Sequence, residues 1–97
     1  MDDLVGKVVE WHHDRNLIDG ATDESQSVKL LEEYTELVAS LIPFAKPAHI
    51  ATIAIGNVVS LLEDKRIKPV KPEDAQAAKK DALGDMLVVM INIAERN

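Results

Sequence analysis

Apolar and polar positions recur with a helical period along most of this chain, and proline and glycine interrupt the pattern between periodic stretches. No segment has the features of a β-hairpin, and neither internal repeats nor low-complexity segments occur. The sequence therefore predicts an all-α fold. The four predicted helices cover approximately residues 2–15, 23–42, 48–64 and 72–95.

The ends of these helices are marked by recognisable residues. Gly20 suits a turn after the first helix, and Pro43 stops the second. We expect Asp23 to cap the second helix, with Gln26 three residues later completing a capping box. The fourth helix opens at Pro72, followed by acids that the helix dipole favours. The preceding residues, 65–71, contain a proline and four basic side chains and are predicted to be a linker.

The third and fourth helices carry apolar residues over most of their circumference, which is more than one buried face requires. A chain of 97 residues has little interior in which to bury two such helices. We therefore expect a four-helix bundle that is completed by oligomerisation. The apolar positions are Ile50, Ile53, Ala54, Ile55, Val58, Val59, Leu61 and Leu62 in the third helix, and Leu83, Met86, Leu87, Met90, Ile91, Ile93 and Ala94 in the fourth.

Composition narrows the class of protein further. The length predicts one domain over residues 1–97, and the net charge of -6 argues against a nucleic-acid groove. Cysteine is absent, which excludes disulfides and thiolate metal sites. No uncharged apolar run approaches ~20 residues, and no signal peptide is recognisable. We expect a cytoplasmic protein with no membrane or nucleic-acid partner.

Two acidic clusters about fifty residues apart carry the candidate chemistry. Because successive helical residues advance by about 100°, the second cluster places Asp81 and Asp85 on one narrow stripe, with Asp74 and Asn92 in line. The first cluster lies on the second helix. There Gln26, Lys29, Glu33 and Glu36 share one face, with Glu32 to one side.

If the two stripes face each other, four or five carboxylates converge, and that arrangement makes sense mainly with a cation present. Oxygen ligands without histidine or sulfur select Mg²⁺ or Mn²⁺. Lys29, one turn before Glu33, is placed to meet a phosphate oxygen. The simpler interpretation also stands: charged stripes opposite an apolar face are typical of any soluble amphipathic helix. Aspartate is a mediocre helix former, however, so its presence inside a predicted helix favours a functional explanation.

The run Lys29-Leu-Leu-Glu-Glu-Tyr-Thr-Glu-Leu37, followed by Asp81-Ala-Leu-Gly-Asp-Met-Leu-Val-Val89, resembles the MazG-type nucleoside triphosphate pyrophosphohydrolases, with the short phage-encoded forms most similar. The resemblance covers nearly the whole chain. It implies an all-α dimer or tetramer that uses Mg²⁺ to hydrolyse a nucleoside triphosphate, ribose or deoxyribose, to the monophosphate and pyrophosphate.

The resemblance also implies roles for individual residues. Glu33 and Glu36 match the first metal-binding pair of the EExxE motif, and Glu32 is its third acid, which we expect to orient the attacking water. Asp85 matches the aspartate of the second motif, E-x-x-D. Ala82 occupies the place of that motif's glutamate, so we expect Asp81, one turn before Asp85, to substitute for it. Lys29, Gln26, Trp11 and Asn92 are the expected substrate-binding residues.

The sequence leaves two roles open for Trp11, which either stacks on the nucleobase or belongs to the core. His13 follows Glu10 with the E-x-x-H spacing of di-iron bundles, but a second such unit is missing, so we interpret the histidines as surface or base-recognition residues.

The alternative function is a catalytically weakened MazG-like module that binds nucleotide or protein, because Ala82 departs from the motif.

Overall fold

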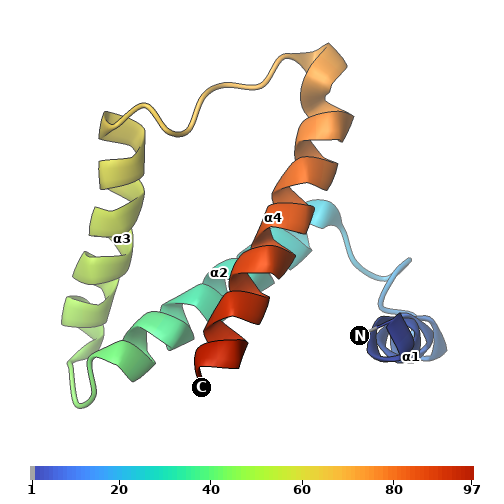
Figure 1. Ribbon diagram of the computed structural model, residues 1–97, viewed down its shortest axis with the longest axis horizontal. Helices are drawn as coiled ribbons and strands as arrows, with labels where there is room; N and C mark the ends of the chain where they lie inside the picture. The colour runs from blue at the N-terminus through green and yellow to red at the C-terminus, as the bar shows by residue number, and fades with distance from the viewer. Residues whose placement is uncertain (1) are drawn as a thin grey trace. The chain divides into compact units, whose positions relative to one another are not determined.

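The computed structural model describes residues 2–97 and is entirely helical over that range, with turns between the helices and no strand (Figure 1). This confirms the predicted all-α class and the four predicted helices. Each helix begins and ends within two residues of its predicted bounds, apart from the first turn of the last. The elements are α1 (Asp2–Asp14), α2 (Asp23–Leu41), α3 (Pro47–Glu63), the 3₁₀ turn η1 (Pro72–Asp74) and α4 (Ala75–Arg96).

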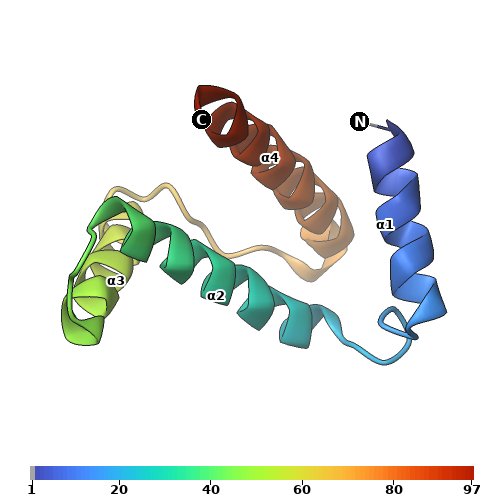
Figure 2. The same ribbon diagram turned by 90° about the horizontal axis from the view of Figure 1, so that it is seen from below.

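The chain divides into two compact units, and the division falls within α3, after Val59. The first unit contains α1, α2 and most of α3. The second begins at Ser60 and contains the last turn of α3, the connection to η1, and α4. In the first unit, residues 42–46 join α2 to α3, with Phe44 in the left-handed backbone region at φ 67° (Figure 2).

The start of α2 corrects one expectation. The cap is Thr22 rather than Asp23: Thr22 is extended (φ -123°, ψ 162°), and its side chain accepts a hydrogen bond from the backbone N–H of Ser25. In return, the Ser25 hydroxyl accepts from the Thr22 N–H at 3.0 Å. Asp23 already lies in the helix, where its charge suits the first turn. The capping box is therefore Thr22–Ser25, one residue before the predicted pair, because the Ser25 hydroxyl here takes the place of the usual Glu or Gln side chain.

Gly20 lies in the turn before α2, as predicted, and a close contact explains why glycine is needed there. A Cβ atom on residue 20 would collide with the backbone carbonyl oxygen of Asn16. Asn16 itself has a φ of 53°, which asparagine tolerates better than most residues. The sharp turn between α1 and α2 therefore depends on both residues.

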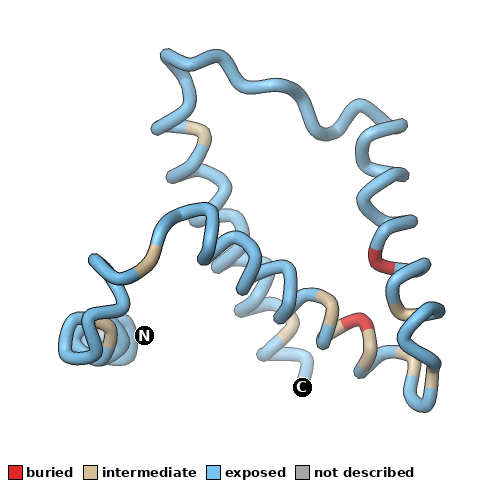
Figure 3. Tube along the Cα trace, turned by 180° about the vertical axis from the view of Figure 1, so that it is seen from behind, coloured by how far each residue is buried: buried red, intermediate tan, exposed pale blue. Residues whose placement is uncertain are grey.

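The core of the first unit is small and lies where α2 meets α3. Val38 and Ala54, 4% and 7% exposed, are the buried apolar residues among those described (Figure 3). Close by, the Asn57 side-chain amide donates to the Tyr34 hydroxyl at 2.8 Å. Each of the two helices thus buries one apolar residue, and a side-chain hydrogen bond joins them.

Most of the remaining apolar surface is uncovered. Within the described chain α4 buries none of its residues, and α3 buries only Ala54. The wide apolar bands expected on these helices are therefore present and exposed. None of the helices in the described range has both the length and the apolar character that crossing a membrane requires.

Candidate functional site

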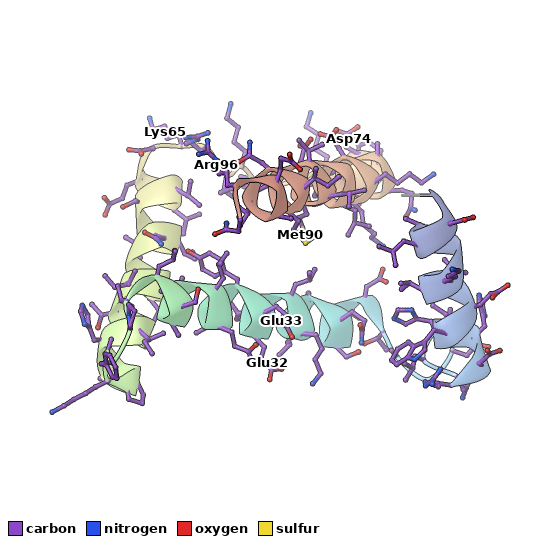
Figure 4. The ribbon with its side chains drawn as sticks, turned by 60° about the horizontal axis from the view of Figure 1, so that its bottom comes forward. Glu32, Glu33, Lys65, Asp74, Met90 and Arg96 are labelled. Atoms are coloured by element: carbon purple, nitrogen blue, oxygen red, sulfur yellow. The ribbon has the colours of Figure 1, made fainter. Side chains whose placement is uncertain are left out.

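The first acidic cluster lies midway along α2, on its exposed surface. Glu32 and Glu33 are adjacent there, and Glu36 follows one turn later (Figure 4). Lys29 forms an ion pair with Glu32, with 3.4 Å between Nζ and Oε2. The predicted phosphate-binding lysine and the predicted water-orienting glutamate are therefore in contact, on solvent-exposed side chains.

The carboxylates of this cluster affect one another. The pKa of Glu36 is raised, chiefly by the negative charge of Glu33. Partial loss of hydration, the charge of Glu32 and a side-chain hydrogen bond with Glu33 act in the same direction. Three acids that repel when ionised form a surface on which a divalent cation would relieve the repulsion. Their oxygen-only chemistry fits Mg²⁺ or Mn²⁺.

An open groove of about 600 Å³ runs between α2 and α3, beside this cluster. Glu32, Thr35 and Glu36 form part of its wall. The Thr35 hydroxyl donates to the carbonyl of Leu31 at 2.7 Å, so it is already engaged. The acids thus border an apolar surface, which sequence reasoning missed because the groove exists only when α3 packs on α2. The other lining residues are Val28, Leu31, Ala39, Pro47, Ile50 and Ala51.

On α4, Asp81 and Asp85 lie one helical turn apart and are exposed. Two predicted members of their stripe differ from expectation. Asp74 belongs to η1 and precedes the α-helix, so it does not continue the stripe with α-helical geometry (Figure 4). Asn92 accepts a hydrogen bond from Arg96, with 2.9 Å between Nε and Oδ1, and is therefore partly occupied within its own helix.

The two acidic clusters belong to different units, α2 to the first and α4 to the second. Over residues 2–97, no three histidine, aspartate or glutamate side chains are gathered in a metal-binding arrangement. The structure therefore defines each acidic cluster by itself, and the expected convergence of both clusters on one metal ion stays a prediction.

Trp11 lies on α1 and is 46% exposed, so it is not a core residue. The Arg15 guanidinium lies over its ring, 4.4 Å from the centroid, and the His12 ring meets it edge-on at 5.2 Å. A nucleobase that stacks on Trp11 would have to use the other face or displace Arg15.

Gln26, another predicted substrate residue, lines a separate small cavity of about 200 Å³ where α1 and α2 meet. His12 lines the same cavity, and its Nδ1 is 2.8 Å from the carbonyl oxygen of Val8. The turn residues Leu17, Ile18 and Ala21 form its apolar part. His12 and Gln26 thus line the same cavity, and a role for either in base recognition stays a prediction.

Comparison with known proteins gives little functional information. No family model matches the chain, and no solved structure matches it. The chain is similar to a protein of Haemophilus phage HP1 described as an uncharacterized 18.2 kDa protein in the rep-hol intergenic region, with 27% identity over 94 residues. The alignment covers 97% of this chain but only 39% of that protein. The similarity associates this chain with a phage protein and assigns no activity.

Proposed function

We propose that this protein is a Mg²⁺-dependent nucleoside triphosphate pyrophosphohydrolase of the MazG type, hydrolysing a ribo- or deoxyribonucleoside triphosphate to the monophosphate and pyrophosphate in the cytoplasm. The observation that carries the proposal is the cluster Glu32, Glu33 and Glu36 on the exposed surface of α2. Its carboxylates are close enough to raise the pKa of Glu36. Such a cluster is unfavourable without a cation.

Each residue has a role in this proposal. Glu33 and Glu36, with Asp85 and Asp81 from α4, would hold the metal, which when bound supplies positive charge to the substrate phosphates. Glu32 orients the attacking water and accepts its proton. Water hydrolyses the α–β phosphoanhydride bond, and the products are the nucleoside monophosphate and pyrophosphate. Lys29, paired with Glu32 at 3.4 Å in the free protein, turns to a phosphate oxygen when substrate binds.

The scaffold in this proposal is a homo-oligomer, a dimer or tetramer of MazG-like helical bundles. Its support is the apolar surface that the described chain leaves exposed on α3 and α4. Patches of this kind mark interaction surfaces in soluble proteins.

A pyrophosphate-release assay over a panel of NTPs and dNTPs with Mg²⁺ tests the catalytic proposal, with EDTA as the matched control. We expect release with at least one nucleotide and none in EDTA. A thermal-shift titration run beside it reports binding, because a ligand that binds the folded state raises Tm by mass action. Failure of every nucleotide to turn over, while Mg²⁺ raises Tm, would overturn the catalytic role and leave a metal site.

The second candidate is a non-catalytic nucleotide-binding or protein-interaction module, and the alanine at position 82 favours it. In that case nucleotide raises Tm without releasing pyrophosphate. A purely structural bundle would respond to neither Mg²⁺ nor nucleotide.

A further inference from the structure

The connection between α3 and η1 gathers positive charge in a chain that is acidic overall. Four of the 11 lysine and arginine residues lie within residues 65–71, whereas all 17 acidic residues lie outside that range. The range belongs to the second unit and leads directly into η1 (Figure 1). We call it the basic segment: Lys65, Arg66, Ile67, Lys68, Pro69, Val70 and Lys71.

The four positive side chains of the basic segment are unpaired within residues 2–97. Each belongs to an exposed residue, and none forms an ion pair or a side-chain hydrogen bond in that range. Other cations of the chain are engaged, since Lys29 pairs with Glu32 and Arg15 lies over Trp11. Like charges held in one short segment repel one another, and a bound anion would relieve that repulsion.

The backbone of the basic segment adds hydrogen-bond donors to these charges. Helix α3 has ended before it, and Lys71 at its end is extended (φ -71°, ψ 148°). Pro69 has no N–H group. Within the described chain, no acceptor receives a hydrogen bond from the N–H groups of Ile67, Lys68, Val70 and Lys71. Open N–H groups beside lysine and arginine are a donor set that suits phosphate oxygens.

Acidic residues at both ends of the segment limit the length of an anion that it can bind. Glu63 and Asp64 precede it, and Glu73 and Asp74 follow it. Even fully extended, the segment spans no more than roughly 22 Å. A long polyanion such as nucleic acid would continue over these acids and be repelled. An acidic peptide spreads its carboxylates along its length, whereas a short phosphate chain concentrates several negative charges within this span.

We propose that the basic segment binds a short phosphate chain, either the triphosphate of a nucleotide or free pyrophosphate. The Arg66 guanidinium holds two phosphate oxygens at once, and the three lysines act as point charges. These anions are the substrate and product in the proposed function, on which the inference rests for the identity of its ligand. The segment adds phosphate contacts to the one expected from Lys29. The binding itself requires no metal ion.

Calorimetric titration of the full chain with inorganic tripolyphosphate tests the site. EDTA is present, so that no metal ion bridges the anion to the acidic clusters. At fixed ionic strength, Arg66→Gln/Lys68→Gln should raise Kd at least tenfold. Lys7→Gln/Lys46→Gln is the matched control, because it removes the same charge from exposed positions elsewhere, and it should change Kd less than twofold. No binding, or equal weakening in both double variants, would overturn the site.

Other anions test the preference for a short phosphate chain. Titration with pyrophosphate and with a nucleoside triphosphate distinguishes the two sources of that chain, and Arg66→Gln/Lys68→Gln should weaken whichever binds. A short single-stranded DNA and a polyglutamate peptide should bind at least tenfold more weakly than tripolyphosphate. Tighter binding of either would assign the segment to another class of partner and overturn the proposal.

Pyrophosphate release, measured on the same variants, separates this inference from the proposed function. Tripolyphosphate binding that depends on the basic segment, without turnover of any nucleotide, would overturn the catalytic function and leave the phosphate site. Nucleotide turnover together with unchanged tripolyphosphate binding in Arg66→Gln/Lys68→Gln would overturn the phosphate site alone.

Discussion

Helices α2 and α4 both carry acids at helical spacing, yet they differ in how each is built. Helix α2 has a side-chain cap, is joined to α3 by the hydrogen bond between Tyr34 and Asn57, and holds its acids beside an apolar groove. Helix α4 follows a 3₁₀ turn without a side-chain cap and buries no residue within the described chain. The acids of α2 therefore lie on a helix that contacts another helix of its own unit. Asp81 and Asp85 lie on a helix with no buried residue, so a metal site there would need ligands from another surface.

If both helices contribute to one metal site, removing one charge from either should have the same effect. Glu33→Gln and Asp85→Asn should each lower pyrophosphate release by on the order of 100-fold or more, because each loses a carboxylate that holds the charge-neutralising ion. Glu24→Gln, an exposed acid in the first turn of α2, is the control. Circular dichroism should show unchanged helix content in all three. Full activity in either site variant would mean that its helix does not hold the metal.

Exchanging acidic residues in the second motif, which lies on α4, tests which of them contributes to activity. Asp81→Asn should reduce activity by at least tenfold, because we expect Asp81 to replace the glutamate missing at position 82. Ala82→Glu should then fail to raise kcat, since an added acid beside Asp81 increases repulsion at an occupied site. A large gain from Ala82→Glu would instead identify the natural protein as a weakened enzyme.

The side-chain cap at the start of α2 should contribute to stability, whereas the start of η1 and α4 has no such cap. Thr22→Ala should lower the free energy of unfolding by about 1 kcal/mol, because it removes the acceptor for the Ser25 N–H. Lys71→Ala, at the uncapped start of η1, should change it little. Urea denaturation followed by circular dichroism measures both. Equal effects would show that the Thr22–Ser25 box does not stabilise α2.

The smallest expected effect concerns the repulsion within the α2 cluster. Because the folded-state pKa of Glu36 is raised, its contribution to stability is present at low pH and is lost as pH rises through that pKa. Without metal, Tm should therefore fall slightly over this range in the wild type and less in Glu36→Gln. Differential scanning fluorimetry with and without Mg²⁺ measures it. A Tm of Glu36→Gln with the same pH dependence as the wild type would contradict the assignment of the repulsion to this residue.

Local features of the fold were predictable because they depend on neighbouring residues. The end of α2 before Pro43, the turn at Gly20 and the start near Pro72 follow from backbone restrictions of single residues. The α2 cap was predicted at the wrong residue because Thr22 and Asp23 are both good caps, and only the extended backbone of Thr22 separates them. The place of Asp74 was missed for a related reason, since a 3₁₀ turn has no distinctive sequence pattern.

The sequence by itself determined the helices, the acidic stripes on them and the excess of apolar surface, since each follows from spacing along the chain. Only the tertiary structure decided that Asn57 bonds Tyr34 and that Glu32 and Glu36 border a groove. It also left most apolar residues of α3 exposed. Helical periodicity fixes which residues share a face, but contacts between helices distant in sequence decide which face is covered.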